Sequence, residues 1–224
     1  MKKLIGVLAV VVFLAGCASM GGEKMTAEQQ GNTGFLKGYY DRLEPGPKDG
    51  AKKRWIKPDA DFARYNYVML DSVVYFFADD SEYKGIEANE LKKLADDFNK
   101  ALVDALKPHY PIKTEPGVDV LRIRFAITDL HQSHPGLSAI TTVVPVGLGV
   151  SVLKKGATGS WTGSGATSSE MMALDSMSNE VLGVAQDERS ASFGGRFTKW
   201  GSAEEAFKYW AERVKTYLDN VHGK

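Results

Sequence analysis

The sequence predicts an α+β fold, a mostly antiparallel sheet of about four to five strands with two main helices packed on one face. Residues 118–130 alternate between apolar and polar side chains, which is typical of a strand with one buried face and one wet face. Residues 89–107, and the segment that begins at Ser202, instead repeat apolar side chains every three or four positions. That period predicts two amphipathic helices.

Further strands are expected on both sides of this central one. Residues 65–70 are rich in Tyr, Val and Leu, and the same pattern can continue to Phe77. Residues 166–175 and 181–189 are expected to form a hairpin. Asn179 suits the left-handed conformation that the loop of this hairpin needs.

The central strand carries two arginines on the face that is expected to be wet. Arg122 and Arg124 are either an anion-binding site or outer-face positions that pair with acids on neighbouring strands. We expect the pairing, because arginines on a solvated sheet face usually find a carboxylate.

Both predicted helices have recognisable ends. Asn89 is expected to cap the first helix, and Pro108 stops it. The second helix begins with Ser202-Ala203-Glu204-Glu205, the pattern of a capping box. In such a box the serine accepts from an early backbone amide and the glutamate reaches back to the start of the helix.

The composition limits the classes of partner. The chain has 224 residues, and 28 Lys+Arg balance 28 Asp+Glu. A net charge of zero excludes a dominant basic surface, so no nucleic acid partner is expected. The single cysteine excludes an internal disulfide framework and a multi-cysteine metal site, and no cofactor is expected.

The first 17 residues resemble a lipoprotein export signal. Two lysines precede an apolar run that is too short to span a bilayer but suits a signal-peptide core. Leu14-Ala15-Gly16-Cys17 resembles the lipobox of bacterial lipoproteins. The resemblance implies cleavage between Gly16 and Cys17 and lipid attachment at Cys17. An ordinary signal peptide or an uncleaved anchor is the alternative, but charge, core length and the position of the only cysteine favour the lipobox.

These features divide the chain into three expected parts. They are a lipoprotein signal peptide at 1–16, a lipidated cysteine and flexible tether at 17–34, and a single periplasmic α+β domain at 35–224. Aromatic residues just after the tether are expected to pack a short helix or an extended arm onto the domain. Because Ala18 and not Asp follows the cysteine, resemblance to the enteric pattern implies the periplasmic side of the outer membrane.

The segment 135–165 is rich in glycine, and residues 137–153 within it carry no charge. One interpretation is a buried or edge strand followed by a flexible loop. The other is an apolar flap that faces lipid, a ligand or another copy of the protein. In the second interpretation the interaction surface contains Val143, Val146, Leu148, Val150 and Trp161.

Candidate catalytic and metal-binding groups are sparse. His131 and His134 lie three positions apart with Asp129 nearby, and on a tight turn they could share a metal ion. No third ligand has a suitable spacing, so a turn with exposed histidines is expected instead. The sequence therefore predicts neither a metal site nor a catalytic residue.

Several weak motifs follow one another along the chain. They are the lipobox at Cys17, Gly34-Phe35-Leu36-x-x-Tyr39, Tyr65-x-x-Val68-Met69-Leu70-Asp71, Val120-Leu121-Arg122-Ile123-Arg124-x-Ala126-Ile127-Thr128-Asp129, and Glu170-Met171-x-Ala173-Leu174-Asp175, with Trp200 before the last helix. Together they resemble the DUF3313 family of bacterial lipoproteins of unknown function. The resemblance implies an envelope lipoprotein and brings no catalytic residues with it.

The expected function is that of a membrane-anchored envelope lipoprotein, a non-enzymatic accessory or structural protein that binds another envelope component or its own copies. A lipid or small-ligand binding module that uses residues 137–153 is one alternative. A hydrolase or metalloenzyme that uses His131 and His134 is another.

Overall fold

The computed structural model describes residues 33–77, 86–132, 166–190, 192 and 198–224. The strands are β1 (Glu44–Pro45), β2 (Lys53–Ile56), β3 (Tyr67–Leu70), β4 (Val74–Tyr75), β5 (Val120–Leu130), β6 (Ala166–Asp175) and β7 (Val181–Ser190). The helices are the short 3-10 turns η1 (Lys37–Arg42) and η2 (Phe62–Arg64), and the long α1 (Ala88–Leu106) and α4 (Gly201–Val221). The order along the described chain confirms the α+β prediction.

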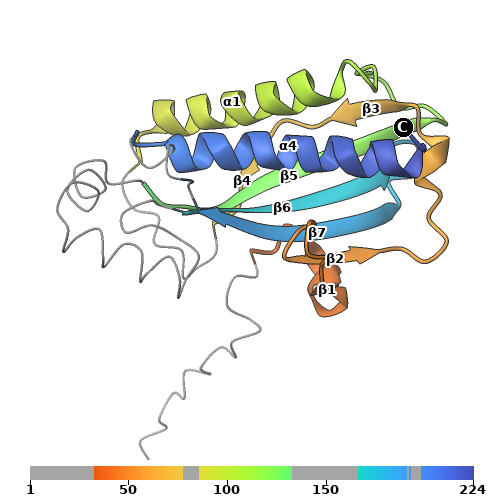
Figure 1. Ribbon diagram of the computed structural model, residues 1–224, viewed down its shortest axis with the longest axis horizontal. Coiled ribbons are helices and arrows are strands. Elements are labelled where there is room, and N and C mark those ends of the chain that lie inside the picture. Colours follow the sequence, from red (N-terminus) through yellow and green to blue (C-terminus); the bar gives the residue numbers. More distant parts are fainter. Residues whose placement is uncertain (1–32, 78–85, 133–165, 191, 193–197) are drawn as a thin grey trace, which may run out of the picture.

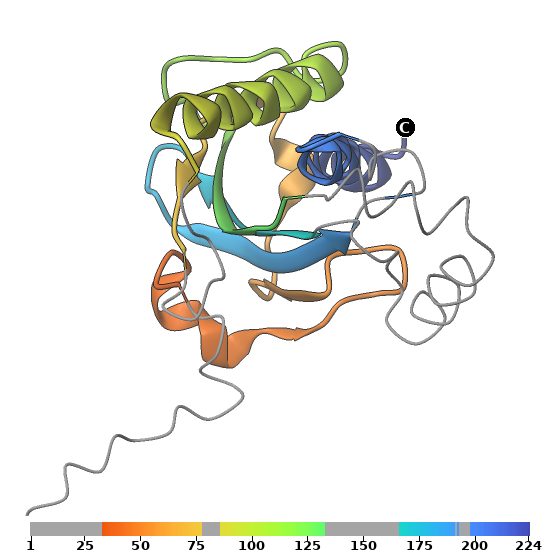
Figure 2. The same cartoon turned by 90° about the vertical axis from the view of Figure 1, so that its left-hand side faces the viewer.

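All seven described strands join one sheet, in the order β1-β2-β7-β6-β5-β3, with β4 also paired to β5. The strand count exceeds the expected four to five because β1 and β4 contain only two residues each, too few to produce a sequence pattern. Helices α1 and α4 cover one face of the sheet, and the N-terminal arm, residues 33–43, lies against the other (Figures 1 and 2).

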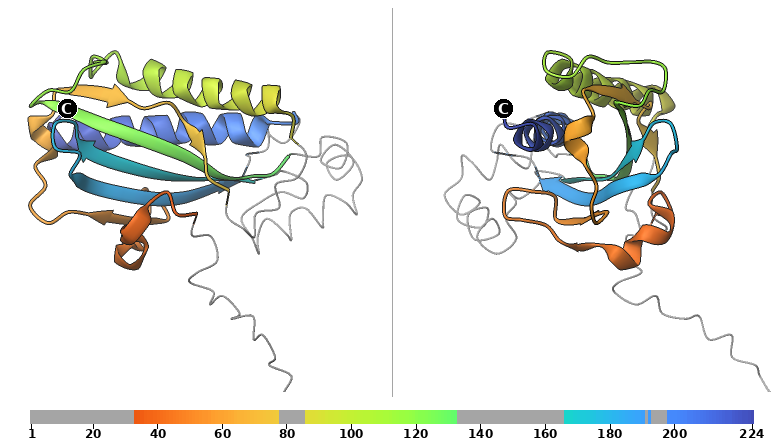
Figure 3. Two further views of the ribbon diagram at one scale, coloured as in Figure 1. Left: turned by 180° about the vertical axis from the view of Figure 1, so that it is seen from behind. Right: turned by 90° about the vertical axis from the view of Figure 1, so that its right-hand side faces the viewer.

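The sheet is mostly antiparallel, as predicted. Strands β5, β6 and β7 form its antiparallel centre, and β3 and β4 pair with β5 in parallel. The expected continuation from residue 65 to Phe77 is interrupted, since the chain after Asp71 leaves the ladder and re-enters it as β4 (Figure 3). The backbone amide of Val73 instead donates to the Asn99 side chain of α1, at 3.1 Å.

The hairpin between β6 and β7 is confirmed. Asn179 has φ 58°, the left-handed conformation that the turn requires. The Asp175 carboxylate organises the same turn, because one of its oxygens accepts hydrogen bonds from the backbone amides of Met177 (3.1 Å) and Ser178 (2.8 Å).

The helices are confirmed, but their caps differ from the prediction. Helix α1 begins after Glu87 rather than at an Asn89 cap, and it ends before Pro108 as expected. The prediction of a capping box at the start of α4 is wrong, because Trp200 precedes the helix and no side chain caps it. Ser202 lies inside the first turn, and Glu205 accepts hydrogen bonds from the amide and hydroxyl of Ser192, at 2.8 and 2.7 Å.

The main core lies between the two long helices and the sheet. Phe98 of α1 is fully buried and stacks on Phe207 of α4, with ring centroids 4.6 Å apart and an interplanar angle of 6°. Phe125 of β5 meets Phe98 from the sheet side, with centroids 4.9 Å apart. These three aromatic rings join both helices to the central strand.

A second apolar cluster covers the opposite face of the sheet. Phe35 and Leu36 of the N-terminal arm are buried against Ala126, Met172 and Leu174. The arm is as expected, but the prediction that this face of β5 is wet is wrong for its second half. Ala126 is 0% and Thr128 5% exposed, whereas Arg122 and Arg124 are partly exposed. The alternation of apolar and polar residues along β5 correctly predicts the face that packs against the helices. It does not show that the N-terminal arm covers the opposite face.

Candidate functional site

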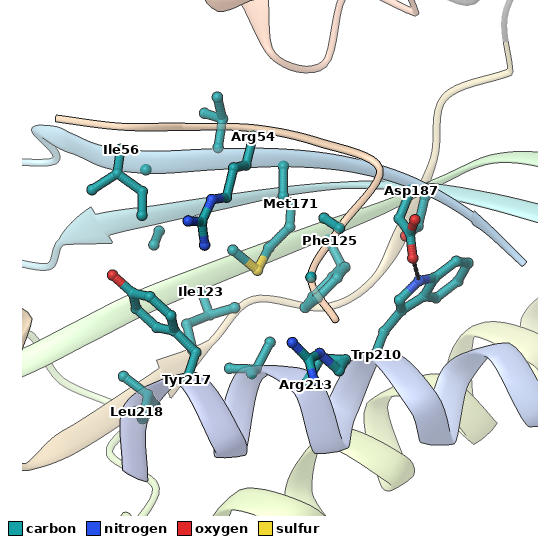
Figure 4. A pocket seen from close by; sticks show the side chains of 18 of the residues that line it. Arg54, Ile56, Ile123, Phe125, Met171, Asp187, Trp210, Arg213, Tyr217 and Leu218 are labelled. Carbon is teal, nitrogen blue, oxygen red and sulfur yellow. Dashed lines mark hydrogen bonds between the residues drawn. The ribbon is translucent and has the colours of Figure 1, made fainter. Parts of the chain in front are cut away.

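A cavity of about 140 Å³ lies between helix α4 and the strands β2, β6 and β7. Figure 4 shows side chains from β2 and α4 facing one another across it. The strand register explains the space. One cross-strand row contains Ile56, Gly183, Ala173 and Ile123, and the next contains Arg54, Ala185, Met171 and Phe125. Three of these eight positions are Gly or Ala, so the sheet surface is hollow opposite α4.

The interior of the cavity is predominantly apolar. Its lining includes Phe62, Ile123, Phe125, Met171 and Val214. Since apolar side chains offer no hydrogen bonds, such a space suits the hydrocarbon part of a ligand better than a chain of ordered water.

Two arginines lie at the rim, one on each side. Arg54 extends from β2 and Arg213 rises from α4 toward the same space (Figure 4). Both side chains are half-buried. Among the residues that the structure describes, neither guanidinium forms an ion pair. The rim therefore presents positive charge next to an apolar interior.

The one carboxylate in the lining is already engaged. Asp187 is 9% exposed and accepts a 2.8 Å hydrogen bond from the indole N–H of Trp210 (Figure 4). Its other oxygen accepts a 3.0 Å bond from the backbone amide of Lys52. These two bonds hold β7, the segment before β2 and α4 together at one end of the cavity.

On the other face of the sheet, a buried carboxylate fastens the N-terminal arm. Glu170 is 0% exposed and accepts hydrogen bonds from the Thr33 hydroxyl at 2.8 Å and the Tyr40 hydroxyl at 3.0 Å. Gln186 donates to its second oxygen at 3.1 Å. Burial raises the pKa of Glu170, and the three donors oppose that rise. We call Glu170, Thr33 and Tyr40 the arm latch.

The arginines predicted on the outer face of β5 do pair with an acid. Arg122 donates two 2.8 Å hydrogen bonds to the two oxygens of Asp71, and the Arg124 Nε lies 3.0 Å from the same carboxylate. Arg122 also donates to Asn179 at 2.7 Å. The ion pair raises the pKa of Arg122 further. The expected pairing is confirmed.

His131 lies at the end of β5, where its Nε2 is 2.7 Å from an Asp129 carboxylate oxygen. His134 lies outside the described residues. In the described part of the chain, no group of three or more His, Cys, Asp or Glu side chains is arranged to hold a metal ion.

The other predicted site residues also lie outside the described residues. They are Gly16 and Cys17 of the lipobox and the surface residues Val143, Val146, Leu148, Val150 and Trp161. The described helices include none with the length and hydropathy of a membrane span.

Sequence reasoning missed both the cavity and the arm latch. A signal for the cavity is present, since Gly183 interrupts the apolar first half of β7 and an isolated glycine in a strand often marks a close backbone approach. The latch has no local signal, because Tyr40 and Glu170 are 130 positions apart.

The fold and the site together define an α+β domain with an arm fastened across one sheet face and a small apolar cavity under its last helix. The chain belongs to the family described as "Protein of unknown function (DUF3313)", whose model matches residues 31–214. No curated protein matches the chain.

Two solved structures are similar in outline. A variant of the PelC dodecamer from Paraburkholderia phytofirmans is 9% identical, with a TM-score of 0.41, over 72% of this chain and 95% of that one. A DUF4136 family protein from Bacteroides thetaiotaomicron is 11% identical, with a TM-score of 0.33, over 74% of this chain and 94% of that one.

Proposed function

We propose that this protein is a lipid-anchored lipoprotein of the bacterial outer membrane whose periplasmic domain binds another envelope component without catalysing a reaction. The observation that carries the proposal is the sequence Leu14-Ala15-Gly16-Cys17 after a short apolar run. Acyl chains on Cys17 hold the protein on the membrane because each buried methylene adds about 0.8 kcal/mol.

The arm latch supports a defined orientation for such an anchored domain. Thr33 is the first described residue, and its hydroxyl binds Glu170 on the sheet face opposite the helices. A tether that ends at Thr33 therefore joins the domain on that face. The helices α1 and α4 lie on the opposite face, so their outer surface faces away from the anchor and is available to a partner.

Two of the buried acids have hydrogen-bond partners within the domain. Glu170 holds the arm, and Asp175 organises the hairpin turn and accepts a 2.9 Å bond from the Tyr65 hydroxyl. These bonds join separate segments of the domain, and this supports a structural role for both carboxylates in the proposed non-catalytic protein.

The anchor can be tested by growing a Gram-negative host with alkyne-tagged palmitic acid. The full chain should carry the tag in the outer-membrane fraction, and Cys17→Ser should lose it. Ala18→Asp should keep the tag and move the protein to the inner membrane. Tag on Cys17→Ser, or an unmoved Ala18→Asp, contradicts the proposed anchor or the proposed membrane respectively.

Partner binding can be tested with a photo-crosslinking amino acid at one exposed position on each face. Lys100 lies on α1 and Asp41 on the N-terminal arm, and both are exposed. We expect a discrete adduct from position 100 and none from 41 in intact cells. A monomer that forms no adduct from either position contradicts the proposal.

A second candidate function is the binding of a small ligand. The cavity between α4 and the sheet favours it, because about 140 Å³ of apolar space has charged groups at its rim. The ligand site proposed here consists of described residues, whereas the sequence analysis expected it at 137–153, outside the described residues.

A further inference from the structure

We propose that the cavity under α4 binds a short amphiphilic carboxylate, with an apolar body of about six carbons inside and the carboxylate held at the rim by Arg54 and Arg213. The proposal rests on the second candidate function and gives it a ligand class. It is independent of the lipid anchor.

The size of the cavity sets the length of the apolar body. An apolar cavity of about 150 Å³ accommodates a molecule of benzene. The space here is about 140 Å³ and is lined by Phe62, Ile123, Phe125, Met171 and Val214, among others. A six-carbon chain or ring therefore fills it, and a long acyl chain does not fit inside.

The charges at the rim select the head group. Arg54 and Arg213 approach from opposite sides, and guanidinium groups bind carboxylates through paired, charge-assisted hydrogen bonds (Figure 4). Asp187 is the acid in the lining, and its oxygens accept from Trp210 and Lys52. An anion at the rim therefore meets two cations. Of the nearby acids, Asp187 already has donors, and Glu44, opposite Arg54 on β1, is exposed to solvent.

The setting of Arg54 favours an anionic ligand. Its cross-strand neighbours are Ala185 on β7 and the exposed Glu44 on β1, and the structure shows no ion pair between Arg54 and Glu44. Burial raises the pKa of Tyr217 from α4, and the nearby charge of Arg54 opposes that rise. A half-buried arginine that forms no ion pair with the described residues has lost part of its hydration, and a bound carboxylate would compensate for that loss. Arg122, by contrast, is matched by Asp71.

Met171 provides a direct readout, since its side chain lines the cavity and faces Arg54 in Figure 4. The full lipoprotein, in phospholipid nanodiscs and labelled with ¹³C-methyl methionine, is titrated with sodium hexanoate. Met171→Leu assigns the signal. We expect a saturable shift of the Met171 methyl, and a weaker one or none with hexylammonium.

Matched variants separate the rim charges from general surface charge. Arg54→Gln and Arg213→Gln should each weaken hexanoate binding about tenfold or more. Lys53→Gln on the same strand and Lys208→Gln on the same helix are both at exposed positions and should leave it unchanged. Ala185→Leu, which fills the hollow from the sheet side, should abolish the shift while the far-UV spectrum stays native.

Each failure has a distinct meaning. Equal binding of hexanoate, hexylammonium and 1-hexanol overturns the role of the arginines and leaves an apolar binding cavity. The absence of any saturable Met171 shift overturns both the ligand class and the second candidate function. Palmitate labelling of Cys17 is unaffected by either result, so the proposed anchor is judged separately.

Discussion

The Tyr40 hydroxyl donates a 3.0 Å hydrogen bond to the Glu170 carboxylate and thereby joins the N-terminal arm to the centre of the sheet. The same hydroxyl accepts bonds from the backbone amides of Gly34 (2.9 Å) and Leu36 (3.3 Å). A single phenol therefore organises the arm and fixes it to β6. In an anchored protein, this contact determines where the tether meets the domain.

Removing that phenol should loosen the arm. Tyr40→Phe leaves the ring in place but deprives buried Glu170 of a donor and two backbone amides of their acceptor. We expect the free energy of unfolding in urea to fall by about 1–3 kcal/mol. Tryptic cleavage at Lys37 should also become faster, because the arm opens more often.

The matched control is Tyr39→Phe on the same turn. The Tyr39 ring packs on Trp55 with centroids 5.1 Å apart, and among the described residues its hydroxyl has no hydrogen-bond partner. The control should therefore behave as wild type in both assays. Equal losses in the two variants would mean that the hydroxyl bond to Glu170 contributes nothing specific.

Glu170 also makes the stability depend on pH. Burial raises its pKa in the folded state above the unfolded value of about 4.3. Protonation therefore stabilises the folded state fully below that unfolded value, and this contribution is lost as the pH rises through the folded pKa. Relative to Glu170→Gln, which cannot ionise, wild type should gain stability as the pH falls from 7 toward 4.5.

Urea unfolding of both proteins at several pH values measures this difference. Glu188→Gln, at an exposed position of the neighbouring strand, is the control and should keep a constant offset from wild type. A wild type that loses stability relative to Glu170→Gln over this range would show that Glu170 is held in its ionised form.

Local sequence patterns are sufficient to predict the elements that pack an apolar face against the main core. The alternation in residues 118–130 and the three-to-four spacing in 89–107 correctly identified β5 and α1, because each packs an apolar face against the main core. The turn at Asn179 was also identified, since its backbone conformation depends on a single residue.

Contacts between distant segments could not be predicted in this way. The segment Lys53–Ile56 carries two basic residues and is only four residues long, so it becomes a strand only through its pairing with β7. Ser202 and Glu205 match a capping box, yet Ser192 captures the glutamate from outside the helix. The cavity is lined by residues of six elements, β2, η2, β5, β6, β7 and α4, so no single segment of the sequence predicts it.

The Asp175 carboxylate should contribute more to the free energy of unfolding than a surface acid does. It accepts from the amide of Ser178 at 2.8 Å and from the hydroxyl of Tyr65 at 2.9 Å, and the Ser178 bond is the largest cause that lowers its pKa. Asp175→Ala should reduce the free energy of unfolding by about 1–3 kcal/mol at pH 7. Asp104→Ala, which breaks an exposed pair with Lys100, should change it by less than about 0.5 kcal/mol.

The pH dependence of this effect has the opposite sign to that of Glu170. A pKa lowered by folding contributes stability above the unfolded value of about 3.9, and the contribution is lost as the pH falls through the folded pKa. The difference between wild type and Asp175→Ala should therefore shrink below about pH 4. A difference that is constant down to pH 2 would mean that the carboxylate charge is not what holds the turn.

The aromatic stack between the two helices should make the largest contribution of the core to the free energy of unfolding. Phe98 is 0% exposed and touches Phe207, Phe125 and Trp210, with ring centroids 4.6, 4.9 and 5.7 Å away. Phe98→Ala removes all three contacts and leaves a cavity, so the free energy of unfolding should fall by about 3–5 kcal/mol. Val118→Ala, at a position 72% exposed, should change it by no more than about 0.5 kcal/mol. Urea unfolding followed by near-ultraviolet circular dichroism measures both. A loss for Phe98→Ala as small as that for Val118→Ala would mean that the two helices are held to the sheet by other contacts.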